Sequence, residues 1–594
     1  MLTYQLGISD TSLGELDEHW TLMKQGSPDV PTSEVWLSDI LPRGASVGVD
    51  PKLVSVSYAE QLSKSLQPAG ISLVAVEDNL IDLVWSGSQP ARPRHPLRLL
   101  PESVTGVSVQ GKLAQLRDKL ITGGASGGFL ATALDDVAWL LNLRGSDIEF
   151  NPVFFAYAYV GLDRAVLYTD NAEQAELEAH LDGAVQVRPY ARVWDDMRAL
   201  ADELNKQAEK GKTRVMLPKT CNWALARMFE KEAREVGPSP VTLAKAVKSE
   251  TELACMREMH VRDAAALCTF FAWVEDQLSE GAELDEIICG DKVDALRAEQ
   301  AVCLMNVVYV GHCEGLFGTF LVNLRPFVSI SVFFLSFSLL FPFSRLLQDF
   351  VGPSFDTISA SGPNGAIVHY RASPATNRPV TRSHLFLCDS GGQYIGGTTD
   401  VTRTLHFGEP TAYERRCFTR VLQGHIALDS TVFPAGTTGY QLDAVTRRPL
   451  WREGKDYRHG TGHGVGAFLN VHEGPHGIGT RIVLNETALQ AGMTVTNEPG
   501  YYESGAFGIR IENVVIVKHA VFSEQQKEEQ SGFLCFEPLT VVPIQTKLVD
   551  QSLLTAGEVE WINAYHARCR EVVAPRVKGR ALEWLLKETE PIGV

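Results

Sequence analysis

The spacing of apolar residues changes along the chain and divides it into regions of different structure. From about Lys245 to Leu278 they recur every three or four residues, which predicts one long amphipathic helix. Before that helix, short apolar strands alternate with helical patterns, at 45–49, 71–76, 152–160, 167–181 and 195–212. After Ser354, strands separated by Gly-rich turns take over. We therefore expect the α/β (α+β) class, with α/β units followed by a mixed domain.

Two Pro-containing breaks suggest where these regions are joined. The segments 90–103 and 237–240 are rich in proline and read as linkers. A chain of 594 residues is expected to form several domains. We expect three, at 1–108, 109–243 and 244–594.

A run of uncharged residues at 326–344 interrupts the third domain. It is long enough for a transmembrane helix. We expect no membrane association, because a single span would put the helix before it and the strands after it on opposite sides of a bilayer. The atypical hydrophobic insert at about 301–345 is then either a surface insertion or a translated intron.

Composition narrows the class of partner. The net charge of −18 argues against a nucleic-acid or anionic-membrane surface, since both require clustered Lys and Arg. The ten cysteines contain no CxxC pair, which is typical of reduced thiols in a cytoplasmic protein. The first residues also show no secretory signal pattern.

Two aspartates flank a Gly-rich stretch in the C-terminal region. Asp389 ends the apolar strand HLFLCD, and Asp400 follows SGGQYIGG. If the hairpin turns about Tyr394 and Ile395, the two carboxylates face each other with Cβ atoms about 4.5–5.5 Å apart. Opposed carboxylates repel and call for a cation between them. Two turn aspartates at the surface are the simpler interpretation when this pair is taken by itself.

Two glutamates and a histidine add further candidate ligands. Glu498 closes the strand MTVTNE, and Glu512 lies inside the β-branched strand GIRIENVVIV. Alternation with a period of two places Arg510 and Glu512 on one face, where an Arg–Glu pair is the alternative to a metal ligand. His463 lies in HGTGHGVG, whose glycines let backbone approach a site closely.

Together these five residues have the composition of a two-metal site. Four carboxylates and a neutral imidazole carry four negative charges, which two divalent cations balance. The carboxylate majority favours a hard cation, so we expect two divalent metal ions per chain, Mn²⁺ first and Zn²⁺ or Co²⁺ as alternatives. The sequence therefore predicts hydrolysis by a hydroxide that bridges two divalent metals.

Two other motifs are rejected on structural grounds. His472–His476 matches HExxH, but Gly474 and Pro475 would lie in the middle of the helix that a zincin site requires. Gly462–Ala467 matches the dinucleotide fingerprint, yet no apolar strand precedes it and no helix pattern follows it.

Three further histidines, His369, His459 and His472, lie near the candidate ligands in sequence. A lone histidine is more often structural. Three around a metal cluster suit amide hydrolysis, which has to protonate a leaving amine.

The order Asp389, Asp400, His463, Glu498 and Glu512 resembles the ligand set of the pita-bread metallopeptidases, which include methionine aminopeptidase, prolidase and aminopeptidase P. The similarity is closest to cytosolic X-prolyl aminopeptidase (aminopeptidase P). It is carried by stretches such as CDSGGQYIGGTTDVTRTLHFG, YRHGTGHGVGAFLNVHEGP and NEPGYYESGAFGIRIENV.

The resemblance implies a fold and an activity. It implies two creatinase-type N-terminal α/β domains, the first one truncated, followed by a pita-bread metallopeptidase catalytic domain. The implied reaction is release of the N-terminal residue from peptides with proline in the second position. A cytoplasmic homodimer is the implied assembly.

The resemblance also assigns metal ligands. Asp400 and Glu512 would bridge the two metals, Asp389 would bind one of them, and His463 with Glu498 would bind the other. Glu498 is in addition a candidate proton acceptor.

Substrate roles follow from the same resemblance. His369 and His472 would line the cleft and handle protons or the scissile carbonyl, and His459 would hold the substrate's N-terminal residue. Arg510 is expected to orient a carboxylate from behind, and Arg144 to reach the cleft from the second domain.

Two alternative functions stay open at this point. A prolidase-like dipeptidase would use the same metal site but reject longer peptides. A non-catalytic pita-bread binding protein is the other alternative, although such proteins usually lose ligand residues and all five ligand types are present here.

The insert gives a first testable prediction. Phe, Ser, Leu and Pro are all encoded by pyrimidine-rich codons, and a pyrimidine tract precedes a 3′ splice site. If roughly 301–345 is a translated intron, sequenced transcripts should skip this segment. Transcripts that cross the region without a gap would refute the hypothesis.

Overall fold

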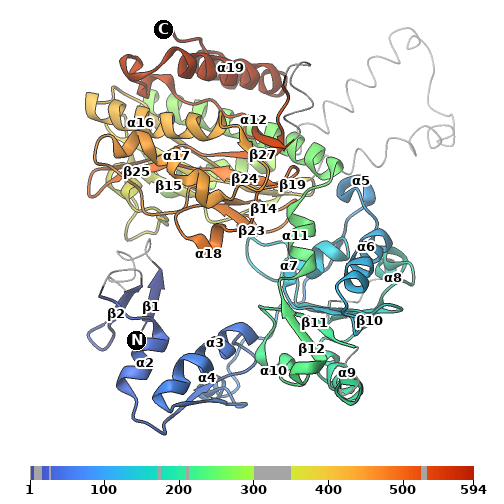
Figure 1. The fold of residues 1–594 in the computed structure, drawn as a ribbon. Coiled ribbons are helices and arrows are strands. Elements are labelled where there is room, and N and C mark those ends of the chain that lie inside the picture. The colour runs from blue at the N-terminus through green and yellow to red at the C-terminus, as the bar shows by residue number, and fades with distance from the viewer. Residues whose placement is uncertain are drawn as a thin grey trace, which may run out of the picture. The chain divides into compact units, whose positions relative to one another are not determined.

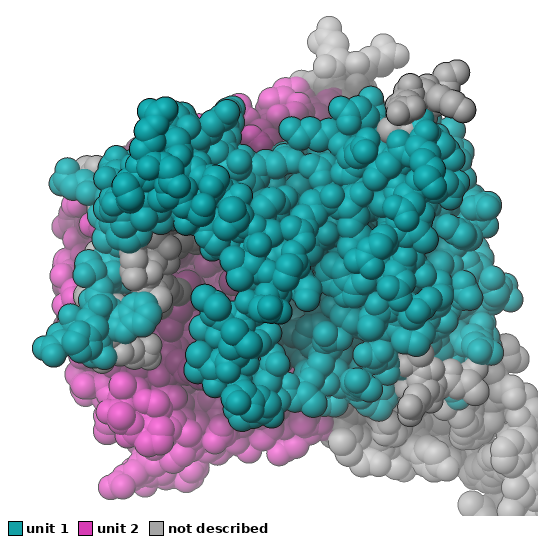
Figure 2. All heavy atoms as spheres, turned by 90° about the horizontal axis from the view of Figure 1, so that it is seen from below, with its two compact units in different colours: residues 1–245 teal, residues 246–594 magenta. Residues whose placement is uncertain are grey.

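The computed structural model of this protein describes most of the chain. The described residues are 2–5, 17–25, 29–171, 175–208, 213–299, 350–522 and 532–593. Contacts divide the chain into two compact units, Met1–Lys245 and Ala246–Val594, which Figure 2 shows in two colours. The three domain boundaries expected from the sequence stay predictions. The insert at about 301–345, with its uncharged run 326–344, lies outside the described residues, and no helix of the described part is long and apolar enough to span a bilayer.

The first part of unit 1 combines short parallel strand pairs with amphipathic helices. Strands form where 45–49 and 71–76 predicted them, and they pair in parallel with Ser46 opposite Ser72. The helix between them starts at Ser55, whose hydroxyl caps the N–H of Tyr58, and it buries an apolar stripe. The elements are β1 (Leu2–Gln5), β2 (Leu22–Gln25), α2 (Ser33–Ile40), β3 (Ser46–Val49), α3 (Val56–Leu66), β4 (Ser72–Ala75) and α4 (Leu80–Trp85).

The rest of unit 1 is built on a six-stranded mixed sheet in the order β10-β9-β8-β6-β11-β12. The expected helix over 167–181 is too long, because Ala165–Thr169 is a fully buried strand and the helix starts at Ala175. The strands of this sheet are β6 (Phe129–Ala131), β8 (Ala156–Val160), β9 (Ala165–Thr169), β10 (Gln186–Arg188), β11 (Val215–Pro218) and β12 (Arg234–Gly237). Its helices are α5 (Glu102–Thr105), α6 (Val109–Thr122), α7 (Leu134–Leu140), α8 (Ala175–Leu181), α9 (Arg192–Ala208), α10 (Trp223–Ala226) and α11 (Pro240–Ala246), with the pair β5 (Arg98–Leu99) and β7 (Leu143–Arg144) beside them.

Unit 2 begins with the long helix that the apolar spacing predicted. Helix α12 (Glu250–Glu280) starts at a capping box between Ser249 and Glu252 and ends at Gly281, whose φ is 79°. Phe270 and Phe271 are buried on it and contact Phe386 and Trp584, with ring centroids 6.4 and 5.6 Å apart. The helix therefore lies in the main core of the unit.

The strand layer in the described part of unit 2 includes a three-stranded antiparallel sheet, β15-β17-β20, and a six-stranded antiparallel sheet, β21-β28-β27-β24-β22-β23. Their strands are β15 (Ile358–Ser361), β17 (Leu385–Ser390), β20 (Val401–His406), β21 (Phe433–Pro434), β22 (Gly462–Gly464), β23 (Glu473–Ile478), β24 (Thr494–Asn497), β27 (Asn513–His519) and β28 (Phe533–Pro538). Separate two- and three-stranded sheets contain β13 (Leu284–Asp285), β14 (Phe350–Pro353), β16 (Pro379–Val380), β18 (Gly392–Tyr394), β19 (Gly397–Thr398), β25 (Gly500–Glu503) and β26 (Phe507–Arg510).

Helices cover this layer, with α16 and α19 on one side of the strands in Figure 1. The core between them takes side chains from α12, β17, β20, α16, α19 and α20. The helices are α16 (Ala412–Asp429), α17 (Gly439–Trp451), α18 (Ile482–Asn485), α19 (Ala556–Val573) and α20 (Gly579–Glu588).

The hairpin between the two aspartates has a different register from the one expected. Asp389 pairs with Thr402, so the prediction that it directly opposes Asp400 is wrong. The turn is centred on Ile395 and Gly396, since Tyr394 pairs with Gly397. A turn displaced by one residue shifts the pairing by two, which keeps both aspartates on one face but makes them diagonal neighbours, a spacing of about 7–8 Å.

Contact with α12 explains where the turn lies. A Cβ added to Gly396 would stand 3.1 Å from Met259 Cγ, and one added to Gly397 would stand 2.9 Å from Met256 Cγ. The turn fits against the helix because both positions lack a side chain.

The same hairpin gives a stability prediction at Gly391. A Cβ there would lie 2.0 Å from the carbonyl oxygen of Thr399, so Gly391→Ala must push the two strands apart. We expect the free energy of unfolding to fall by about 1–3 kcal/mol in denaturant titrations, the usual cost of overpacking. Gly557→Ala is the control, because that position is helical and open, and it should be neutral or gain up to about 1 kcal/mol. Equal stability of the two variants would contradict the prediction.

Candidate metal centre

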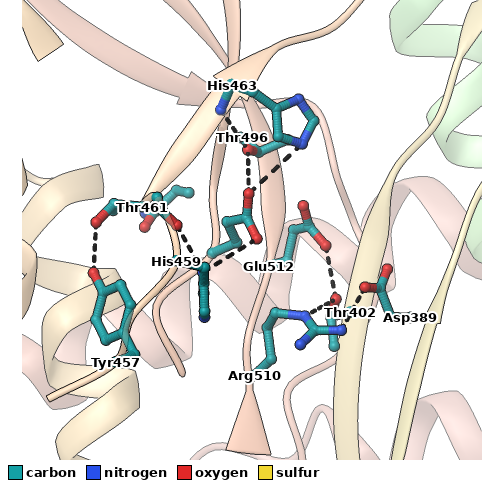
Figure 3. A network of polar contacts seen from close by, with 12 residues as sticks. Asp389, Thr402, Tyr457, His459, Thr461, His463, Thr496, Arg510 and Glu512 are labelled. Carbon is teal, nitrogen blue, oxygen red and sulfur yellow. Dashed lines mark hydrogen bonds and ion pairs between the residues drawn. The ribbon is translucent and has the colours of Figure 1, made fainter. Parts of the chain in front are cut away.

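Strand ends from three parts of unit 2 bring the five candidate ligands together. Asp389 lies in β17 and Asp400 directly precedes β20. His463 is the central residue of β22, Glu498 follows β24, and Glu512 lies between β26 and β27. Figure 3 shows Asp389, His463 and Glu512 around the same space between these strands. The expected single strand through Glu512 is therefore two strands, interrupted at the ligand itself.

The ligand atoms have the spacing of a coordination site. One ligand atom each from Asp400, His463 and Glu512 lies within 4.8 Å of the other two. The Nε2 atom of His463 lies 3.4 Å from Asp400 Oδ2 and 3.6 Å from Glu498 Oε1. Both Asp400 and Glu512 are buried, at 3 % and 2 % exposed.

Electrostatics shows that this cluster needs more positive charge than nearby side chains supply. Burial raises the pKa of Asp400 to about 6, and Asp389 adds to the shift. Burial, with Asp400 and Asp389, raises the pKa of Glu498 to about 7. Burial, together with Asp400, Glu498 and Asp389, raises the pKa of Glu512 well above its usual range. Buried like charges favour the protonated forms, and a cation reverses that preference.

The pKa of the fifth ligand, His463, is also raised, which for an imidazole favours the charged form. Burial by itself would lower the pKa of His463, but Asp400 and Glu498 outweigh it and raise the pKa to about 9. Its Nδ1 lies 2.9 Å from the carbonyl oxygen of Gly464, to which it can donate, which leaves Nε2 facing the carboxylates. A metal ion at Nε2 would take the place of that proton.

Asp389 supplies a direct test of whether the residues fit a cation. Its Oδ2 accepts a 2.6 Å bond from Arg510 Nη2. Its other carboxylate oxygen, Oδ1, is buried without a hydrogen-bond partner among the described residues. An orphaned buried acceptor next to three further carboxylates fits a metal ligand. It does not fit a solvated surface aspartate, which was the simpler interpretation of this residue.

Neighbouring groups fix the other carboxylates in place. Thr402 donates a 2.7 Å bond to Glu512 Oε2 and accepts one of 3.1 Å from Arg510 Nε. This arrangement confirms the predicted alternation, since Arg510 and Glu512 both face Thr402 while their apolar neighbours enter the core. The ion pair of Arg510 is with Asp389, so the alternative Arg–Glu pair is not what Glu512 forms.

Thr496 does the same for the remaining ligands. It donates a 3.2 Å bond to Glu498 Oε1 and accepts a 3.0 Å bond from the backbone N–H of His463. Figure 3 shows Thr496 next to His463. Sequence reasoning missed Thr402 and Thr496; the available signal was the period-two alternation that places them on the same faces as Asp400 and Glu498.

The three additional histidines lie around this centre. The ring of His472 is 4.2 Å from that of His463, centroid to centroid. His459 lies between two aromatic rings and accepts or donates at 2.9 Å to the Tyr502 hydroxyl. Partial burial and the charge of Arg510 lower the pKa of His369. For His459, burial and Arg510 lower the pKa to about 3.

An ion pair on α17 holds the loop that carries His459. Arg447 forms two bonds to Asp443, of 2.7 and 3.1 Å, and donates to the carbonyl oxygen of His459 at 2.8 Å. Asp443 also accepts from Thr461 at 2.5 Å. The i,i+4 spacing of Asp443 and Arg447 was the only sequence signal for this clamp.

Two sequence expectations have separate outcomes. Arg144 is buried in unit 1 and donates to the carbonyl oxygens of Ala138 and Leu143 at 3.1 and 2.9 Å. Its expected substrate role stays a prediction. The rejected HExxH match lies on strand β23, where Glu473 pairs with Lys248 at 2.5 Å and His476 contacts the Thr494 carbonyl at 2.8 Å.

Comparison with known proteins agrees with this geometry. Family models match residues 339–519 (Metallopeptidase family M24), 88–252 (Creatinase/Prolidase N-terminal domain) and 532–592 (C-terminal region of peptidase M24). A probable Xaa-Pro aminopeptidase P of Laccaria bicolor is 44 % identical over 580 residues, which cover 97 % of this chain and 82 % of that protein. One of Neurospora crassa is 44 % identical over 589 residues, with 97 % and 78 % covered. The chain belongs to metallopeptidase family M24.

A solved relative extends the similarity to the fold. The crystal structure of X-prolyl aminopeptidase from Caenorhabditis elegans has a TM-score of 0.85 and 36 % identity, and the match covers 99 % of this chain and 88 % of that one. It is described as a cytosolic enzyme with a di-nuclear active site. The expected fold, creatinase-type N-terminal structure followed by a pita-bread catalytic domain, is confirmed. The M24 chain is a metallo-aminopeptidase, and its ligand set suits two divalent cations.

The raised carboxyl pKa values predict a pH-dependent response to metal. A carboxyl whose pKa is raised by folding stabilises the fold below its unfolded pKa of about 4, and this contribution is lost as pH rises through the folded value. For Asp400 and Glu498 that loss extends through pH 6 and 7 in metal-free protein. The gain in Tm on adding saturating Mn²⁺ should therefore grow as pH rises from 5 to 8. A gain in Tm that stays constant or shrinks over this pH range in thermal scans would contradict the prediction. In Asp400→Asn the gain in Tm should depend less on pH.

Proposed function

We propose that this M24 enzyme is an Xaa-Pro aminopeptidase that releases the N-terminal residue from peptides with proline in the second position. The observation that carries the proposal is the convergence of Asp400, His463 and Glu512, with Glu498 and Asp389 beside them. The names of its relatives supply the specificity for proline. The description of one relative as cytosolic supports a cytoplasmic location, and a homodimer is expected from the family resemblance.

The five ligands would hold two divalent cations, with Mn²⁺ expected because four of the five side chains are carboxylates. Asp400 and Glu512 would bridge the ions, Asp389 would bind one, and His463 with Glu498 would bind the other. Ions bound there would activate a water molecule and polarise the peptide carbonyl.

Glu498 is the proposed proton acceptor for the attacking water. Thr496 donates to its Oε1, while its Oε2 lies 3.9 Å from His459 Nδ1. Thr496 thus orients Oε1, which also lies near His463, while Oε2 lies toward His459. This division lets Glu498 hold a proton at Oε2 without losing its orientation.

The histidines are proposed to serve the substrate. His472, whose ring centroid lies 4.2 Å from that of His463, would contact the scissile carbonyl of the substrate. His369, which belongs to the segment that packs against β26, would pass a proton to the leaving proline nitrogen. His459 is held by Tyr502 and by the loop clamp on α17, and it would bind the substrate's N-terminal residue. Arg510 orients Asp389 through their 2.6 Å bond.

An activity assay tests the proposal directly. Mn²⁺-loaded protein should release the first residue from an Xaa-Pro-Xaa tripeptide. Chromatography measures the released amino acid. Asp400→Asn and Glu512→Gln should each lower kcat/KM by about 10²–10³-fold or more, the scale of losing electrostatic stabilisation of a transition state. Asp195→Asn, an exposed position on α9, is the control and should leave the rate unchanged.

The outcomes separate the alternatives. Hydrolysis of Xaa-Pro dipeptides with no cleavage of tripeptides would favour the prolidase-like reaction. A folded sample that binds two ions and cleaves neither substrate would overturn the proposed activity, and a sample that binds none would favour a non-catalytic role.

A further inference from the structure

Glu286 is a buried acid that lies outside the metal centre. It directly follows β13 and starts the helical residues 286–299. Its side chain is completely buried, with 0 % of the residue exposed. A carboxylate in that position requires several hydrogen-bond donors.

All the donors that the structure gives Glu286 come from one segment, residues 361–378. The backbone N–H groups of Ser361 and Arg378 donate at 2.7 and 2.8 Å. Asn364 Nδ2 lies 3.0 Å from Oε2, and the Tyr370 hydroxyl donates at 2.7 Å. The Glu286 carboxylate therefore binds both ends of this segment and its middle. We call residues 361–378 the His369 loop.

Further bonds close the base of the His369 loop. The backbone N–H of Glu286 donates to the Arg378 carbonyl at 3.1 Å. Asn364 Nδ2 also donates to the Thr376 carbonyl at 3.0 Å, and the Tyr370 hydroxyl oxygen lies 3.0 Å from the same carbonyl. Since Tyr370 is the next residue after His369, its hydroxyl anchor restricts where the imidazole can lie.

The loop meets the metal centre on its other side. A Cβ added to Gly508 on β26 would stand 1.7 Å from the Gly365 carbonyl oxygen, so the loop and this strand are in close backbone contact. Strand β26 ends at Arg510, which holds the ligand Asp389. The His369 loop is thus fixed between Glu286 and the strand that orients a metal ligand.

We propose that Glu286 is a positioning residue whose buried carboxylate holds the His369 loop, and with it His369, in register with the metal centre. The inference rests on the proposed function, in which His369 passes a proton to the leaving amine. Glu286 touches neither ligand nor substrate and acts through His369.

The first test is a kinetic coupling measurement on the full chain loaded with Mn²⁺. Glu286→Gln keeps the size of the side chain but replaces one carboxylate oxygen, an acceptor, by an NH₂ group. That donor would face the N–H groups of the loop. We expect kcat for an Xaa-Pro tripeptide to fall about 10–100-fold, the scale of a small misplacement of a catalytic group, with KM changed by less than about threefold. In a His369→Ala background, Glu286→Gln should lower kcat by less than about twofold. Independent, multiplying losses in the double variant would overturn the proposal.

Two companion variants guard against a general loss of folding. Tyr370→Phe removes a single donor to Glu286 and should lower kcat in the same direction by a smaller factor. Asp429→Asn removes a buried carboxylate on α16 that accepts from Trp561 at 2.8 Å, and it should leave kcat within about twofold. An equal loss in the control and in Glu286→Gln would overturn the assignment.

A measurement without turnover separates this inference from the proposed function. Amide hydrogen exchange in 361–378 should be at least about tenfold faster in Glu286→Gln than in wild type, while exchange in β17 is unchanged. If wild-type protein does not cleave Xaa-Pro peptides, the proposed function fails and the exchange result still decides whether Glu286 holds the loop. Unchanged exchange in this segment would overturn the inference.

Discussion

The site depends on a cluster of buried negative charge that the chain only partly neutralises. Arg510 compensates Asp389, but Asp400, Glu498 and Glu512 share one imidazole between them. Without cations these acids favour their protonated forms, because burial and mutual repulsion both oppose ionisation. Folding of this region and binding of divalent metal are therefore coupled, since the same charges that oppose folding create the affinity.

Preorganisation of the ligands comes from short polar side chains on the same strands. Thr402 holds Glu512, Thr496 holds Glu498, and both hydroxyls also bind a group of another strand, Arg510 and the backbone of His463. A second level of support comes from buried ion pairs and acids such as Arg447–Asp443 on α17. Hydrogen bonds of this kind set the orientation of a metal ligand before the metal arrives.

Much of the fold and of the candidate site could be predicted from the sequence. The three- and four-residue apolar spacing predicted α12 within a few residues, and alternation predicted that Arg510 and Glu512 share a face. The register of the Asp389 hairpin could not be predicted, because contact of Gly396 and Gly397 with α12 decides where the chain turns. Glu286 offered no signal either, since its donors are backbone N–H groups and side chains more than seventy residues away.

By itself the sequence determined the chemistry of this protein. Four acids and a histidine in strand and turn contexts predict a site for divalent cations, because local residue type sets charge and ligand preference. Only the tertiary structure decided that Asp389 Oδ2 is bound by Arg510, that Oδ1 has no hydrogen-bond partner among the described residues, and that the His369 loop packs against β26. Those outcomes depend on contacts between segments distant in the chain, and local patterns carry no information about such distances.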